Sequence, residues 1–141
     1  MRRLPGWRRR MAAFIDEVRR HPLAWGEFDC GPAFAGRHVE LMTGDDLAAR
    51  WRGQYDSPAG ALRLIRAAGF GDLGDLVASL LREIHPSTAR IGDLAGVPAE
   101  GGFGIGLGIV AGDRIFVLHP DDGLGTVDLL AARRAWRVGD A

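Results

Sequence analysis

Cys30 is the residue whose position most favours chemistry, and it is the single cysteine of the chain. It follows Asp29, a good helix N-cap, and precedes Gly31-Pro32, where proline is tolerated in a first helical turn. We therefore expect a helix to begin at Cys30. The N–H groups and dipole at a helix start stabilise a thiolate and lower the thiol pKa, as a nucleophile requires. The alternative is a packed, unreactive residue, because free cysteines are among the most buried residue types.

A cysteine nucleophile also needs a base, which is usually a histidine within hydrogen-bond distance. Of the four histidines, His119 is the candidate, because it ends the predicted strand 115–118 and a strand end can face a helix start. The segment His119-Pro120-Asp121-Asp122-Gly123 is equally typical of an ordinary polar turn. His38 lies within the Cys30 helix on a mostly apolar face, so we expect a core histidine there.

Other polar and glycine-rich segments indicate no cofactor and no metal. Residues 102–109 alternate glycine with large apolar residues, whereas a dinucleotide fingerprint needs a different glycine spacing at a strand-to-helix turn. In a strand this alternation gives a glycine-lined face, which we expect the Cys30 helix to approach. Glu40, Asp45 and Asp46 form an acidic group typical of solvated loops, so we assign no metal. The aromatic loop 51–55 could anchor itself to the fold or contact a partner or a glycan.

The order of the predicted elements is typical of an α+β domain. Apolar residues at helical spacing predict four helices before residue 86: 7–18, 30–42, 58–68 and 73–84. After Pro86, four short β-prone runs separated by Gly, Asp and Pro predict an antiparallel meander: 91–97, 104–111, 114–118 and 125–127. A short helix over 129–136 is expected to complete a single domain, residues 1–141.

Composition excludes several classes of protein. Eighteen Lys+Arg and eighteen Asp+Glu give a formal net charge of +0, which argues against a nucleic-acid partner held by phosphate neutralisation. Charged residues or glycines interrupt every apolar run before the roughly 20 residues needed to span a bilayer. The basic N-terminus is followed by an apolar stretch, Met11 to Ile15, shorter than the about 7–15 residues of a secretory signal. We therefore expect no membrane span and no signal peptide.

Several short motifs, in their order, resemble a small uncharacterised family found in the tail gene clusters of tailed phages and gene transfer agents. That family is similar to the NlpC-type peptidoglycan peptidases, which have a papain-like α+β fold. The resemblance covers nearly the whole chain, and its specificity lies in the order of these motifs: Trp25-Gly26-Glu27-Phe28-Asp29-Cys30-Gly31, Met42-Thr43-Gly44, Arg52-Gly53-Gln54-Tyr55, Arg90-Ile91-Gly92-Asp93-Leu94 and Ala135-Trp136-Arg137-Val138.

The resemblance assigns a role to each matching position. It maps the nucleophile to Cys30, and it maps the Gly-Asp pair that begins the sheet to Gly92-Asp93. It maps the second strand to Gly106-Leu107-Gly108-Ile109, with its turn at Gly112-Asp113, so the usual histidine base is replaced by Gly106. The third polar position falls at or beside His119. The resemblance thus implies a nucleophile without the usual base.

Two functions follow as expectations. The first is a tail-tip protein of the virion, docked on hub or baseplate proteins, with an NlpC-type fold that is degenerate as a peptidase and structural. The second is an active cysteine endopeptidase that cuts peptidoglycan stem peptides during DNA entry, with Cys30 and His119 as catalytic residues. Loss of one member of such a catalytic set costs on the order of 10³-fold or more in turnover. The first function is therefore favoured unless His119 acts as the base.

Overall fold

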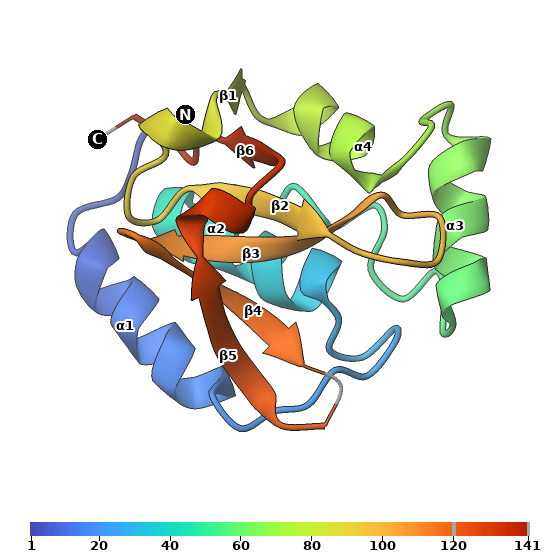
Figure 1. The fold of residues 1–141 in the computed structure, drawn as a ribbon, viewed down its shortest axis with the longest axis horizontal. Helices are drawn as coiled ribbons and strands as arrows, with labels where there is room; N and C mark the ends of the chain where they lie inside the picture. Colours follow the sequence, from blue (N-terminus) through green and yellow to red (C-terminus); the bar gives the residue numbers. More distant parts are fainter. Residues whose placement is uncertain (120, 141) are drawn as a thin grey trace.

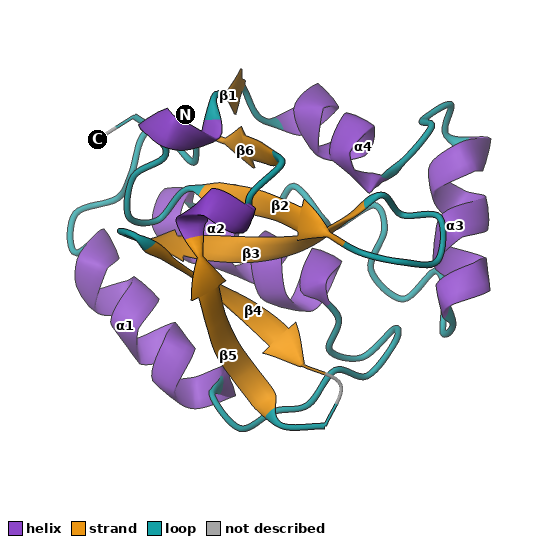
Figure 2. Ribbon diagram, viewed as in Figure 1, coloured by secondary structure: helices purple, strands orange, loops and turns teal. Residues whose placement is uncertain are grey.

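The computed structural model describes residues 1–119 and 121–140, and in this part of the chain helices surround an antiparallel sheet (Figures 1 and 2). The helical elements are α1 (Trp7–Val18), η1 (Cys30–Gly36), α2 (Arg37–Thr43), α3 (Pro58–Ala67), α4 (Leu73–Leu80), η2 (Pro86–Thr88) and η3 (Leu129–Ala131). The strands are β1 (Glu83–Ile84), β2 (Leu94–Pro98), β3 (Ile105–Ala111), β4 (Arg114–His119), β5 (Gly123–Asp128) and β6 (Arg134–Trp136). No helix within these residues has the length and apolar content needed to cross a bilayer.

The strand order is β1-β6-β2-β3-β4-β5, with every neighbouring pair antiparallel. The predicted α+β class and the predicted meander, which forms β2 to β5, are confirmed. The β3–β4 hairpin turns at Gly112-Asp113, where Gly112 has φ +85°, a backbone conformation that favours glycine. The expected turn after His119 includes Pro120, which lies outside the described residues, as does Ala141 at the end of the expected domain.

Two predicted helical segments form strands instead. The helix expected over 73–84 ends at Leu80, because Leu81 is extended and Glu83-Ile84 pair with Trp136-Ala135. The helix expected over 129–136 is wrong beyond η3, because residues 134–136 form β6 between β1 and β2. Ala135 and Trp136 are fully buried there. Pairing and burial in the sheet outweigh the helical preference of this alanine-rich segment.

The two faces of the sheet are covered differently. Helices α1, η1 and α2 pack on one face, where they meet Ile105, Leu107 and Ile109 of β3 in the largest core cluster. Val110 belongs to a separate cluster on the other face. Side chains alternate along a strand, so the glycines of β3 lie on the face of Val110. The expectation that the glycine-lined face receives the Cys30 helix is therefore wrong, since the large side chains contact the helices.

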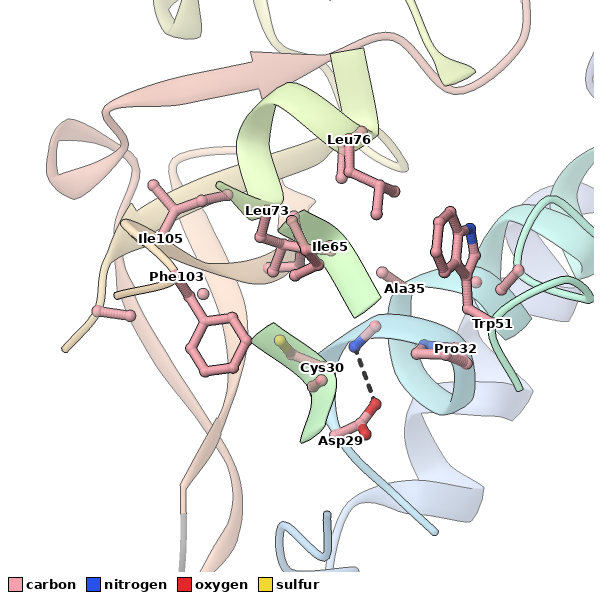
Figure 3. Close-up of a pocket in the computed structure, with 18 of the residues that line it drawn as sticks. Asp29, Cys30, Pro32, Ala35, Trp51, Ile65, Leu73, Leu76, Phe103 and Ile105 are labelled. Atoms are coloured by element: carbon pink, nitrogen blue, oxygen red, sulfur yellow. Dashed lines mark hydrogen bonds between the residues drawn. The ribbon is translucent and has the colours of Figure 1, made fainter. Parts of the chain in front are cut away.

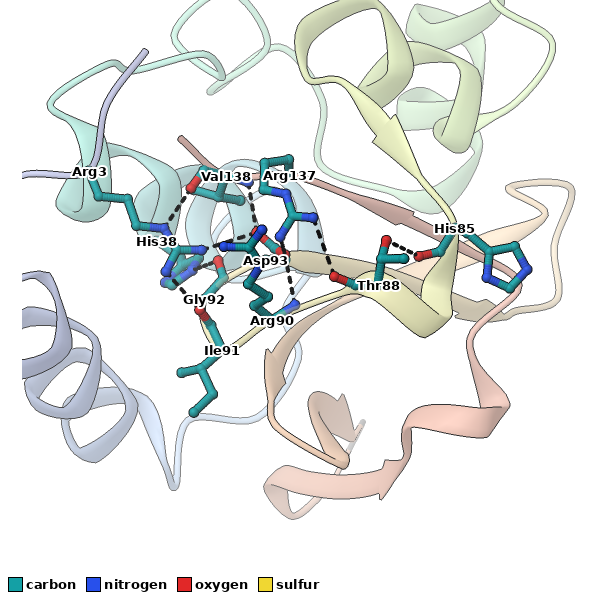
Figure 4. Close-up of polar contacts among 10 residues, drawn as sticks. All are labelled: Arg3, His38, His85, Thr88, Arg90, Ile91, Gly92, Asp93, Arg137 and Val138. Atoms are coloured by element: carbon teal, nitrogen blue, oxygen red, sulfur yellow. Dashed lines mark hydrogen bonds and ion pairs between the residues drawn. The ribbon is translucent and has the colours of Figure 1, made fainter. Parts of the chain in front are cut away.

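The buried carboxylate of Asp93 holds the two ends of the chain against the start of β2 (Figure 4). Oδ1 accepts from Arg3 Nη2 (3.1 Å) and from the Val138 N–H (3.0 Å). Oδ2 accepts from Arg137 Nη1 (2.8 Å) and from the Arg90 N–H (2.8 Å). The Gly-Asp pair thus directly precedes β2, whereas the short strand β1 comes before it in the chain, and the Asp93 carboxylate also joins the termini.

Candidate active site

Cys30 begins η1, and its helix start has the predicted N-cap. Asp29 is extended, and its Oδ1 accepts a hydrogen bond from the Gly31 N–H at 3.2 Å. The first seven residues of the helix, Cys30 to Gly36, are π-helical, and the helix continues directly as α2. Short π-helical segments inside helices are frequent at functional sites. The helix start at Cys30 is therefore confirmed, with a wider first turn than an α-helix has.

The carboxylate of Asp29 accepts three hydrogen bonds that hold the loop beside Cys30. Its side chain is buried, and Oδ2 accepts from the Gly26 N–H at 3.2 Å and from the Tyr55 hydroxyl at 2.6 Å. Burial, with a further contribution from the hydrogen bond to Asp29, raises the pKa of Tyr55, so the hydroxyl stays a donor. The sequence left anchoring as one interpretation of loop 51–55, and Tyr55 provides that anchor. A contact between positions 26 residues apart has no local sequence signal.

The pKa of the Cys30 thiol is raised, whereas a nucleophile at a helix start is expected to have a lowered pKa. Cys30 is partly buried, and its pKa is raised to about 11, chiefly by desolvation among apolar groups and to a smaller extent by the negative charge of Asp29. The backbone amides of Leu107 and of Cys30 itself act in the opposite direction and lower the pKa by less. The expected decrease in pKa is therefore wrong: desolvation of the thiolate outweighs the helix start.

His119 lies on the other face of the sheet from the Cys30 helix. Along β4, Phe116 and Leu118 pack against the helix-side cluster, whereas Val117 belongs to the cluster on the opposite face. His119 follows in alternation with Val117, is exposed, and lays its imidazole over Gly125 of β5. The structure therefore places Cys30 and His119 on opposite faces of the sheet and does not bring them together.

Position 106, where the resemblance places the base, also lies on the face of Val110. A Cβ built at Gly106 would meet the Cβ of Ala99 at 3.7 Å, so a side chain there would extend toward the end of β2. The neighbouring groups that act on the thiol pKa are instead the backbone of Leu107 and the carboxylate of Asp29. Neither supplies a free base, because the amide donates and the carboxylate already accepts three hydrogen bonds.

The remaining polar candidates have structural partners. His38 is fully buried, and its Nε2 lies 2.8 Å from the Gly92 carbonyl, so it is the core histidine that the sequence predicted. In the acidic group, Asp46 is paired with Arg52 and Glu40 with Arg37. Within the described residues, no group of three or more His, Cys, Asp or Glu side chains could hold a metal ion.

A cavity of about 600 Å³ opens beside Cys30 and extends between the main core and helices α3 and α4 (Figure 3). Its wall is almost entirely apolar. The labelled walls in Figure 3 come from the Cys30 helix, loop 51–55, α3, α4 and the segment before β3, and include Ala35, Trp51, Ile65, Leu73, Leu76 and Phe103. The sequence contained the residues of this cavity but no pattern that predicted it, because they come from separate segments spread between Leu23 and Leu118.

Comparison with solved structures supports the fold. The NlpC/p60 domain of the peptidoglycan hydrolase SagA matches with a TM-score of 0.55 and 18% sequence identity, covering 92% of this chain and 97% of that domain. At this identity the likeness concerns the fold alone, which is NlpC/p60-like and, in general terms, papain-like. Comparison with curated proteins finds no match. The model of the family described as "Domain of unknown function (DUF6950)" matches residues 2–138, and the chain therefore belongs to that family.

Proposed function

We propose that this chain is a non-hydrolytic protein with an NlpC/p60-like fold, which acts as a structural and binding component of a phage or gene-transfer-agent tail tip. The observation that carries the non-hydrolytic part is the environment of Cys30. A cysteine nucleophile reacts as the thiolate, and burial holds the pKa of this thiol at about 11. Near neutral pH the sulfur is therefore protonated and poorly nucleophilic.

The arrangement of bases leads to the same proposal. His119 lies beyond the sheet from the sulfur, position 106 carries no side chain, and the Asp29 carboxylate is occupied by Tyr55 and two amides. General-base activation requires a group within hydrogen-bond reach of the proton that it removes. Activity through Cys30 and His119 would need β4 and β5 to rearrange. A fold of this kind can persist as a binding or structural module, because fold does not imply activity.

The tail-tip location is supported by the order of the five motifs that resemble the phage and gene-transfer-agent family, and by no single residue. We propose that the chain is assembled into the virion with hub or baseplate proteins, and that any contact with peptidoglycan is binding. Purified particles from a strain encoding the chain should contain it, and it should co-purify with tail proteins after mild disassembly. Mass spectrometry that finds tail proteins in such particles without this chain contradicts the location.

The pH dependence of Cys30 alkylation tests the non-hydrolytic proposal directly, because the chain has a single cysteine. We expect an apparent pKa above the free value of about 8.5, and the same value in the His119→Ala variant. Denatured protein provides the control for an unhindered thiol. An apparent pKa below about 7 that rises in His119→Ala identifies a working Cys-His pair and overturns the proposal.

Peptidoglycan digestion separates the two functions at the level of the reaction. Sacculi incubated with the protein and with the Cys30→Ala variant should give identical muropeptide profiles. Stem-peptide cleavage that is present with the unmodified chain and absent with Cys30→Ala establishes instead the cysteine endopeptidase. Variant His119→Ala then shows whether that activity depends on the imidazole.

A further inference from the structure

The cavity beside Cys30 has the dimensions of a binding site for a small molecule. Its volume of about 600 Å³ falls within the range of roughly 300–1,000 Å³ typical of ligand pockets. It is lined by residues of two hydrophobic clusters: the main core, which includes Leu107, and a smaller one formed by α3, α4 and Phe103. Protein interiors are normally close-packed, so a space of this size between two cores is available for an occupant.

The wall chemistry selects against a charged occupant. Four titratable residues line the cavity: Asp29, Cys30, Tyr55 and Glu100, and the described lining residues include no arginine and no histidine. Asp29 and Tyr55 are hydrogen-bonded to one another. A buried anion would therefore lack a cation and lie near Asp29, and burial of an unpaired charge is strongly unfavourable.

The wall also offers little to a peptide backbone. Each amide of a buried peptide needs hydrogen-bond partners, whereas the side chains exposed to the cavity are mainly Leu, Ile, Val and aromatic residues. Trp25 and Phe103 stack with ring centroids 5.2 Å apart and planes 20° apart, and so form a flat, rigid wall. A hydrocarbon chain matches these walls, because it fills apolar volume and requires no hydrogen bond.

We propose that the cavity binds an uncharged molecule bearing a long acyl or alkyl chain, with the chain lying between Trp51, the Trp25–Phe103 stack and the start of η1. This inference rests on the proposed function, since it treats the space beside Cys30 as a binding site. The Cys30 thiol is then part of the apolar wall. Two sources could supply such a ligand, a free molecule or a membrane lipid, and both would place the same hydrocarbon chain in the cavity.

Fluorescence of the neutral probe N-phenyl-1-naphthylamine, measured with the complete chain, tests the proposal. We expect saturable binding of the probe and its displacement by hexadecan-1-ol. Incubation with phosphatidylcholine vesicles, followed by removal of the vesicles and extraction of the protein, distinguishes the sources, since phospholipid stays with the protein only where a membrane lipid supplies the chain. Failure of the probe to bind, or failure of hexadecan-1-ol to displace it, overturns the proposal.

Two tryptophans provide a matched pair of variants. Trp51 lines the cavity and Trp7 lies on α1, and each is partly buried with an arginine guanidinium 4.5 Å from its ring centroid. We expect Trp51→Ala to weaken probe binding by about tenfold or more and Trp7→Ala to leave it unchanged. The reverse result places the probe on the surface of α1 and contradicts the proposal.

A filling variant covers the case in which Trp51→Ala fails to fold. Ala35 is buried at the cavity wall, and Ala35→Met would place its longer side chain in existing space, so the variant should fold and bind the probe about tenfold more weakly. Unchanged affinity in folded Ala35→Met contradicts the proposal. Probe binding is measured without peptidoglycan, whereas peptidase activity is read from muropeptide profiles, so a failure of this inference is distinguishable from a failure of the proposed function.

Discussion

At the scale of single residues, His38 gives the fold a defined pH dependence. It is buried beside the Arg3–Asp93 pair, and desolvation is the main cause that lowers its pKa to about 4. A carbonyl only accepts, so the neutral ring donates from Nε2 to Gly92. Below its ordinary pKa of about 6.5, the unfolded chain binds a proton that the folded chain refuses, and stability therefore falls as the pH falls from 6.5 toward 4.

Urea unfolding measures this linkage. Between pH 7 and pH 5 we expect the free energy of unfolding to fall by about 2 kcal/mol from this residue alone. His38→Gln keeps a donor for Gly92 and cannot titrate, so its pH dependence over the same interval should be flatter. Parallel curves for the two proteins show that His38 does not carry the effect.

Replacement of the Asp93 carboxylate should cause a large loss of folding stability. This carboxylate accepts four hydrogen bonds and faces two guanidinium groups, those of Arg3 and Arg137. Asp93→Asn turns one acceptor into a donor and leaves the two arginines without a negatively charged partner. We therefore expect the free energy of unfolding to fall by about 3–5 kcal/mol. Asp128→Asn provides the matched control, because Asp128 caps η3 at the surface and its replacement should cost about 1 kcal/mol or less. Equal losses in the two variants contradict the role of Asp93.

At the scale of elements, the sequence predicted those that local signals define. The bounds of α1, the Asp29 cap and the start of α3 at Pro58 are set by residues close together in the chain, and all were predicted correctly. Strands β1 and β6 were missed, because each exists only through its partner strands. The candidate site shows the same division. Its cysteine and cap were found from sequence, whereas the Tyr55 anchor, the apolar cavity and the high thiol pKa arise from packing between distant segments.

The π-helical η1 depends on a close contact that helix propensity does not describe. A Cβ built at Gly36 would lie 2.7 Å from the Cβ of Ala48, at the start of the loop that carries Trp51 and Tyr55. Gly→Ala inside a helix normally stabilises by about 1 kcal/mol. Here Gly36→Ala should destabilise by about 1–3 kcal/mol, because the loop must move. The double variant Gly36→Ala with Ala48→Gly should recover most of that loss in thermal unfolding. No recovery in the double variant shows that the contact with Ala48 is not the cause.

At the scale of the whole molecule, the network that joins the chain ends and the apolar cavity lie in different parts of the fold. The chain ends meet around Asp93, on the opposite side of the molecule from α3 in Figure 1, whereas the cavity is walled by α3, α4 and the Cys30 helix. Arg3 joins the first segment to the last, with its guanidinium donating to the Val138 carbonyl at 2.9 Å, to the Ile91 carbonyl at 2.8 Å and to Asp93.

Arg3→Ala should therefore destabilise the molecule without altering the cavity. We expect a loss of about 3 kcal/mol in urea unfolding, because the Asp93 network loses one of its two cations. Effects at sites without shared partners are usually independent. At low temperature, where Arg3→Ala remains folded, N-phenyl-1-naphthylamine should bind it as it binds the unmodified chain. Loss of probe binding in the folded variant would show that the joined termini also set the spacing between the two hydrophobic clusters, and that the cavity depends on the entire sheet.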